Sequence, residues 1–97
     1  MDFPIGWAPR AASHLEQICA YISQDSETYA CIFAKKVLSI VEGIASFPMI
    51  GRVVPEYNDQ NLRERIYGNY RIVYRLKDDV VEIAAICHGA QPLEKVL

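Results

Sequence analysis

The stretch that decides the fold reads Asn61-Leu62-Arg63-Glu64-Arg65-Ile66-Tyr67-Gly68-Asn69-Tyr70-Arg71-Ile72-Val73-Tyr74-Arg75. Two runs rich in aromatic and β-branched residues flank a Gly-Asn pair, which is typical of a β-hairpin. In the second run, apolar side chains alternate with the arginines at positions 71 and 75, so the arginines fall on the opposite face. The sequence therefore predicts a hairpin with one face that packs and one basic face that binds.

A third strand follows the hairpin and ends in His88-Gly89-Ala90-Gln91. The alternating runs predict strands over residues 62–67, 70–77 and 80–88, with Asp78-Asp79 as a second turn. A two-residue turn there pairs Leu76 with Val81 and Tyr74 with Ile83.

The register of the first hairpin is a choice between two pairings. A strict two-residue turn at Gly68-Asn69 places Arg63 beside Tyr74 and Arg65 beside Ile72, on the apolar face. Burial of two unpaired guanidinium groups would cost several kcal/mol, so we expect a three-residue or bulged connection instead. That register predicts a helix-facing set of Leu62, Ile66, Ile72, Tyr74, Ile83 and Ala85, with Cys87 at its end. It places Arg63, Arg65, Arg71, Arg75, Lys77, Glu82 and His88 on the other face.

The first half of the chain has helical periodicity. A short extended segment over residues 3–7 precedes a helix expected from Pro9 to Ser23, where apolar residues recur at helical spacing. A second helix is expected after an N-cap at Asp25 or Ser26 and should end near Ser46, because Pro48 cannot continue it. Residues 49–61 have little periodicity and are expected to form a loop.

Length and composition limit the class of protein. The chain has 97 residues, 52% of them apolar, and a formal net charge of −2 from 10 basic and 12 acidic side chains. We expect one domain over residues 1–97, and with no apolar run of membrane-spanning length and no signal peptide we expect a cytoplasmic protein. Cys19, Cys31 and Cys87 lack metal-ligand spacing and are expected to be reduced and buried. No metal cluster or cofactor motif is present, so no cofactor is expected.

Basic residues are concentrated in the second half of the chain, which points to an anionic partner. Six basic residues lie between positions 52 and 77, and five of them are arginines. The planar guanidinium groups of arginine match phosphate and carboxylate groups, which favours a binding surface. The alternative is an ordinary solvent-exposed sheet face, which would also carry charged residues. His88 could act as a general acid or base or simply end its strand, and Glu56 could be a base or a solvated loop charge. The candidate basic residues are Arg52, Arg63, Arg65, Arg71, Arg75 and Lys77.

Six short motifs occur in order along the chain. They are Trp7-Ala8-Pro9-x-Ala11, Leu15-x-x-Ile18-x-x-Tyr21-Ile22, Phe47-Pro48-x-x-Gly51-Arg52, Arg63-Glu64, Tyr70-Arg71-Ile72-Val73-Tyr74-Arg75 and His88-Gly89-Ala90-Gln91. Together they resemble the RelE/ParE superfamily of type II toxin–antitoxin toxins, and more closely its ParE-like branch. Ala8 and Arg65 depart from the pattern, at positions that concern packing.

The resemblance implies an α+β fold of order β-α-α-β-β-β, with a helical hairpin packed on one face of a small, mostly antiparallel sheet. It implies a toxin neutralised by a ParD-like or RelB-like antitoxin. We expect the basic residues and His88 to bind either that antitoxin or the target of the toxin. ParE-like members poison DNA gyrase, whereas RelE-like members are ribosome-dependent mRNA endoribonucleases. In the ribonuclease pattern, Arg71 matches the transition-state arginine, and Glu56 and His88 approximate the acid/base positions.

The acidic balance of the chain favours the gyrase-directed mechanism, because docking into ribosomal RNA is helped by net positive charge. A binding module without toxicity stays an alternative.

Overall fold

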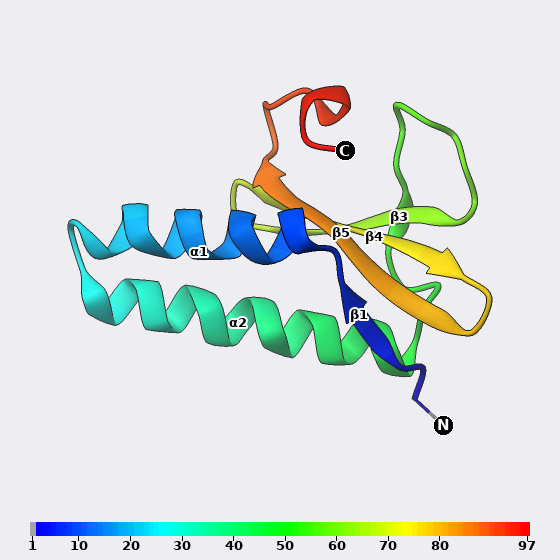
Figure 1. Ribbon diagram of the computed structural model, residues 1–97, viewed down its shortest axis with the longest axis horizontal. Coiled ribbons are helices and arrows are strands. Elements are labelled where there is room, and N and C mark those ends of the chain that lie inside the picture. Colours follow the sequence, from blue (N-terminus) through cyan, green and yellow to red (C-terminus); the bar gives the residue numbers. More distant parts are fainter. Residues whose placement is uncertain (1) are drawn as a thin grey trace.

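Two helices and five strands follow one another along the chain in the computed structural model, which describes residues 2–97 (Figure 1). The expected α+β class and order of elements are confirmed, and β2 is an additional short strand inside the segment expected to be a loop. The elements are β1 (Ile5–Trp7), α1 (Pro9–Ser23), α2 (Glu27–Ser46), β2 (Arg52–Val53), β3 (Leu62–Tyr67), β4 (Tyr70–Lys77), β5 (Val80–His88) and the 3₁₀ helix η1 (Leu93–Lys95).

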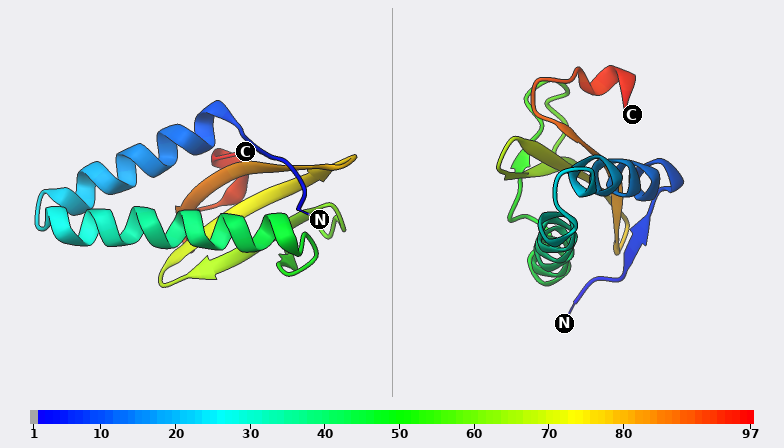
Figure 2. Two further views of the ribbon diagram at one scale, coloured as in Figure 1. Left: turned by 90° about the horizontal axis from the view of Figure 1, so that it is seen from below. Right: turned by 90° about the vertical axis from the view of Figure 1, so that its left-hand side faces the viewer.

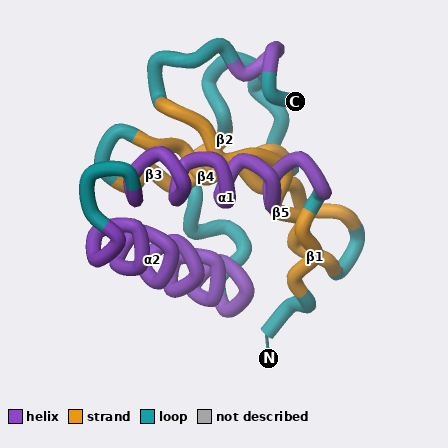
Figure 3. The backbone as a smooth tube through the Cα atoms, turned by 60° about the vertical axis from the view of Figure 1, so that its left-hand side comes forward, coloured by secondary structure: helices purple, strands orange, loops and turns teal. Residues whose placement is uncertain are grey.

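The strands form one mixed sheet in the order β1-β5-β4-β3-β2. β1 runs parallel to β5, and the other neighbours are antiparallel. The helices form an antiparallel hairpin that lies against one face of this sheet, called here the helix face (Figures 1 and 2). The C-terminal segment and the loop after β2 lie near each other, away from α2 (Figure 3). Both pack against the opposite face of the sheet, called here the outer face.

Local sequence signals set the helix ends. α1 begins at Pro9, which has no N–H to leave unsatisfied, although its N-cap Ala8 makes no side-chain capping bond. α2 begins after Ser26, whose Oγ accepts the backbone N–H of Tyr29 at 3.1 Å. It ends at Ser46, two residues before Pro48, as the sequence predicts.

The turn between β3 and β4 is a two-residue turn, and the expected three-residue connection is wrong. Tyr67 lies opposite Tyr70, and Gly68 takes a φ of +58°, a conformation that glycine adopts without strain. Arg63 therefore lies opposite Tyr74 on the helix face and is 8% exposed.

The expected cost of burying Arg63 is avoided because its guanidinium group is paired. Nε donates to the carbonyl oxygen of Gln60 and Nη1 to that of Gly51, both at 2.9 Å, and Nη2 donates to Oε1 of Gln60 at 3.1 Å. A guanidinium with several hydrogen-bonded partners does not bear the penalty of an isolated buried charge.

The set of residues predicted to face the helices is half correct. Ile72, Tyr74 and Ile83 pack with the helices, whereas Leu62 and Ala85 belong to a second cluster on the outer face, and Ile66 is 53% exposed. A bulge in β5, where the pairing shifts between Val73 and Tyr74, moves Ala85 and Cys87 to that outer face. The outer cluster consists of Val54, Leu62, Val73, Ala85, Cys87, Leu93 and Val96.

Two further expectations can be compared with the structure. Cys87 is buried and Cys19 is half-buried, but Cys31 is exposed on α2, so its expected burial is wrong. Neither helix within residues 2–97 combines the length and the apolar character needed to cross a lipid bilayer.

Candidate functional site

A buried ion pair lies on the outer face, between β3 and β4. Arg71 points outward from β4, because it alternates with Tyr70 and Ile72 of the helix face. Its Nε and Nη2 atoms both lie 2.6 Å from Oε1 of Glu64 in β3. The side chain of Glu64 is completely buried, and that of Arg71 is 8% exposed.

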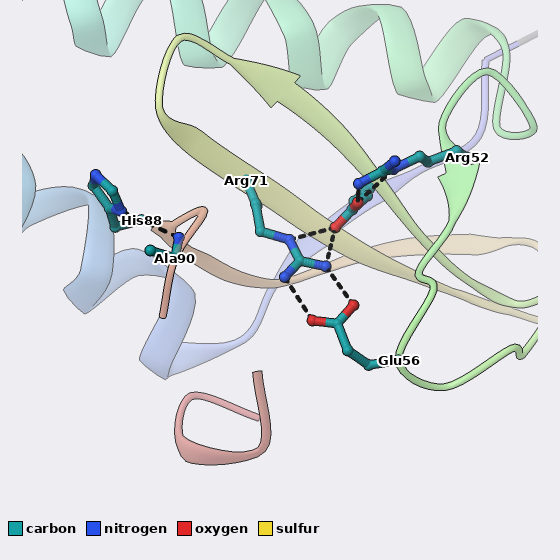
Figure 4. Close-up of polar contacts among 6 residues, drawn as sticks. Arg52, Glu56, Arg71, His88 and Ala90 are labelled. Atoms are coloured by element: carbon teal, nitrogen blue, oxygen red, sulfur yellow. Dashed lines mark hydrogen bonds and ion pairs between the residues drawn. The ribbon is translucent and has the colours of Figure 1, made fainter. Parts of the chain in front are cut away.

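The loop after β2 contributes a second carboxylate to Arg71. Oε2 of Glu56 accepts Nη1 of Arg71 at 2.7 Å, and Oε1 accepts Nη2 at 2.9 Å, in a two-pronged pair (Figure 4). Glu56 itself is 45% exposed, so this loop residue covers a buried cation from the solvent side.

Arg52 completes the cluster from β2. Its Nε and Nη2 atoms lie 2.6 Å from Oε2 of Glu64, so each oxygen of that carboxylate serves one arginine. The Arg52 side chain is 62% exposed. Arg52, Arg71, Glu56 and Glu64, called here the carboxylate–arginine cluster, carry two positive and two negative charges and sum to zero.

Hydrogen bonding from Arg71 sets the ionisation of Glu56. It lowers the pKa of the Glu56 carboxyl from 4.5 to about 2, against a smaller opposing effect of burial. The two carboxylates raise the pKa of Arg71 further above its ordinary value. Both groups are therefore charged throughout the physiological range, and Glu56 is a poor proton acceptor at neutral pH.

The pairing of Arg71 limits its chemistry. All three nitrogens of its guanidinium group contact a carboxylate oxygen, and the four contacts occupy four of its five N–H groups. An arginine that stabilises charge on a phosphate directs free N–H groups at that phosphate. Arg71 could offer a phosphate a pair of N–H groups only after Glu56 had moved away.

His88 does not join this cluster. It lies opposite Tyr70 in the β4–β5 ladder, and the two rings are 5.8 Å apart, which places His88 on the helix face. Its Nδ1 accepts the backbone N–H of Ala90 at 3.2 Å, and Figure 4 shows the ring turned away from Arg71. His88 lines a cavity of about 420 Å³ together with residues of α1 that include His14 and Tyr21.

The predicted basic face is divided between the two sides of the sheet. Arg63 and Arg65 lie on the helix face, so their predicted place beside Arg71 is wrong. Arg75 and Lys77 do lie on the outer face, where both contact Glu82.

Two charged residues of the outer side were not recognised as site residues from the sequence. The expected three-residue register would place Glu64 on the helix face together with Leu62 and Ile66, where a carboxylate has no evident role. Its alternation with Leu62 and Ile66 would have placed it beside Arg71 in the correct register. Arg10 carries no local signal, because only the packing of α1 brings it near Arg75.

Within residues 2–97, no group of three or more histidine, cysteine, aspartate or glutamate side chains is arranged to hold a metal ion.

Comparisons with known proteins add to this geometry. Residues 5–93 match the family model described as ParE toxin of type II toxin-antitoxin system, parDE. The chain is 32% identical over 95 residues to the protein named "Putative toxin Y4kP" from Sinorhizobium fredii, covering 96% of this chain and 95% of that protein.

Solved structures of toxin–antitoxin systems are among those that share the fold. A chromosomal ParDE toxin–antitoxin system from P. aeruginosa matches with a TM-score of 0.71 and 17% identity, over 89% of this chain and 95% of the other. The RelBE2 toxin–antitoxin complex from Mycobacterium tuberculosis matches with a TM-score of 0.64 and 17% identity, over 91% and 99%.

Proposed function

The chain belongs to the ParE toxin family of type II toxin–antitoxin systems, and from that membership we propose that it inhibits or poisons DNA gyrase without cleaving RNA. The ParE-like branch that the sequence resembles acts in this way. As a gyrase-directed toxin it would act in the cytoplasm.

One observation carries the choice of mechanism: the three residues that would have to cut RNA are not assembled. Arg71 is paired with Glu56 and Glu64, and His88 lies across the sheet from it. In-line cleavage would need a base at the ribose 2′-hydroxyl, an acid at the leaving oxygen and a free arginine at the phosphate. The overall charge of −2 also opposes unaided docking into ribosomal RNA.

We also propose a cognate antitoxin of the ParD or RelB type as the protein partner. The two solved structures described above, which share the fold, belong to toxin–antitoxin systems. A short reading frame beside this one, whose product relieves growth arrest on co-expression, would support this part of the proposal. Growth that continues normally when the chain is expressed alone would favour the non-toxic binding module.

The decisive experiment compares two targets with the same purified protein. Gyrase supercoiling and DNA-cleavage assays are run beside ribosome-programmed mRNA cleavage, with the wild type and His88→Ala. We expect gyrase inhibition that His88→Ala retains, because no proton transfer is needed. A ribonuclease would lose about 10²–10⁴-fold in rate on removal of its general acid. Cleavage of mRNA that His88→Ala abolishes, with gyrase unaffected, would reverse the assignment.

A further inference from the structure

A cavity of about 550 Å³ lies where α1 begins, beside the outer face of β4 and β5. Its walls combine Arg10 from the first turn of α1 with Arg75 and Lys77 from β4 and Glu82 from β5. These four side chains, called here the cationic cavity, come from segments that are more than 60 positions apart in the sequence.

The cations in this cavity are only weakly neutralised. Nη1 of Arg75 and Nζ of Lys77 contact the same oxygen of Glu82, at 3.2 and 3.5 Å. Arg10 donates to the backbone oxygens of Val96 and Leu97 and has no carboxylate side-chain partner within residues 2–97. Glu82 thus contacts two of the three cations and Arg10 is held by main-chain oxygens, whereas Arg71 alone is held by two carboxylates.

The cavity also contrasts in charge with the rest of the molecule. Three cations and one carboxylate give it a charge of +2, and the whole chain carries 10 basic and 12 acidic side chains. The remaining 7 basic and 11 acidic side chains therefore sum to −4. The uncapped start of α1, with no acidic residue in its first turn, adds a partial positive charge at the same place.

We propose that the cationic cavity binds the carboxylates of an acidic peptide segment from the protein partner of this toxin. Arginine and lysine side chains that converge on one space are suited to discrete carboxylates, which they can contact in pairs. A nucleic acid would extend its phosphates beyond the cavity, and the rest of the chain, whose formal side-chain charges sum to −4, offers no net positive charge to hold them. The proposal rests on the antitoxin part of the proposed function and not on the choice of gyrase as target.

Binding can be tested directly, without gyrase or ribosomes. The probe is an octaglutamate peptide, titrated at low ionic strength into ¹⁵N-labelled protein, with octaglutamine as the neutral control. We expect backbone amide shifts at Arg10, Arg75 and Ala84 for octaglutamate and none for octaglutamine. The affinity should fall steeply with added salt, because the contacts are exposed to solvent.

Charge-matched variants assign the site. Arg75→Ala/Lys77→Ala should weaken octaglutamate binding about tenfold, because charge pairs at the rim of an interface contribute modestly each. Lys35→Ala/Lys36→Ala removes the same charge from the exposed face of α2 and should change the affinity less than about threefold.

A gain of affinity provides an independent test. Glu82→Gln removes the competing carboxylate and should tighten octaglutamate binding about threefold, whereas Glu42→Gln, on the exposed face of α2, should tighten it much less. Equal effects of the two glutamate variants, or amide shifts confined to other surfaces, would overturn the proposal. An octathymidylate that binds the same residues more tightly than octaglutamate would also overturn it. Because none of these outcomes involves gyrase, loss of gyrase inhibition would count against the proposed function alone.

Discussion

Arg71 and Glu64 lie on neighbouring strands but do not face each other directly. Glu64 is opposite Val73 and Arg71 is opposite Ile66, so the ion pair runs diagonally across β3 and β4. Both Nε and Nη2 of Arg71 reach the same carboxylate oxygen, at 2.6 Å, and the loop residue Glu56 closes the other side. The buried carboxylate of Glu64 is paired with two arginines, Arg71 and Arg52, so it is not an isolated charge in the protein interior.

The first prediction concerns that buried carboxylate. Glu64→Gln should lower the free energy of unfolding by about 3–5 kcal/mol, because it removes one partner of a buried ion pair and leaves Arg71 undercompensated. Urea unfolding followed by circular dichroism measures the change. Glu82→Gln is the control, since its pairs with Arg75 and Lys77 are partly exposed, and it should cost about 0.2–1 kcal/mol. Equal costs for the two variants would contradict the importance of burial.

The second prediction concerns the pH dependence that Glu56 introduces. Because its pKa is lowered from 4.5 to about 2 in the folded protein, its contribution to stability is present above pH 4.5 and is lost as the pH falls toward 2. The difference in unfolding free energy between the wild type and Glu56→Gln should therefore shrink over that window. A ¹³C titration of the Glu56 carboxyl should have its midpoint near pH 2. A midpoint near 4.5 would mean that Glu56 does not contact Arg71 in solution.

The third prediction concerns the close approach at Gly51. A Cβ atom there would lie 2.6 Å from the hydroxyl oxygen of Tyr74 and 2.7 Å from the backbone oxygen of Glu64. Gly51→Ala should therefore cost about 1–3 kcal/mol and disturb the bond from the Gly51 N–H to Tyr74. Gly43→Ala, in α2 with open space around it, should instead stabilise the protein by about 0.5–1 kcal/mol. Thermal unfolding of the two variants in parallel tests the opposite signs.

The fourth prediction concerns His14, whose side chain supplies a hydrogen-bond acceptor to β5 beyond the last residue that pairs with β1. Its Nδ1 accepts the backbone N–H of Ile86 at 3.2 Å, beyond the point where β1 ends. Loss of this acceptor in His14→Ala should cost about 1–3 kcal/mol. His88→Ala, at an exposed strand end, should stay within about 0.5 kcal/mol of the wild type.

His14 should also make stability depend on pH. Burial, with a smaller effect of Arg10, lowers the pKa of His14 below 6.5 in the folded protein. The unfolded chain therefore binds a proton first as the pH falls below 6.5, and stability should decline there. Denaturant unfolding between pH 7.5 and 5 should show this slope in the wild type and a flatter one in His14→Ala. An unchanged slope in the variant would assign the pH dependence to other groups.

The sequence alone determined most elements of this fold, and only the short β2 and η1 were not expected from it. The bounds of α1, β3, β4 and β5 agree with the expectation, because hydrophobic periodicity and turn residues act over a few neighbouring positions. The pairing of Tyr74 with Ile83 also followed from a local turn. The family was recognisable for a similar reason, since its motifs are short and occur in order along the chain.

Tertiary structure decided which side chains meet. Arg63 could be buried because a loop supplied carbonyl oxygens from Gln60 and Gly51, partners that no strand pattern reveals. The bulge in β5 moved Ala85 to the outer face, where the C-terminal segment covers it. The cationic cavity arises in the same way, because the parallel pairing of β1 with β5 brings the start of α1, and with it Arg10, beside Arg75. Contacts between distant segments depend on loop partners and register shifts, and local periodicity carries no information about either.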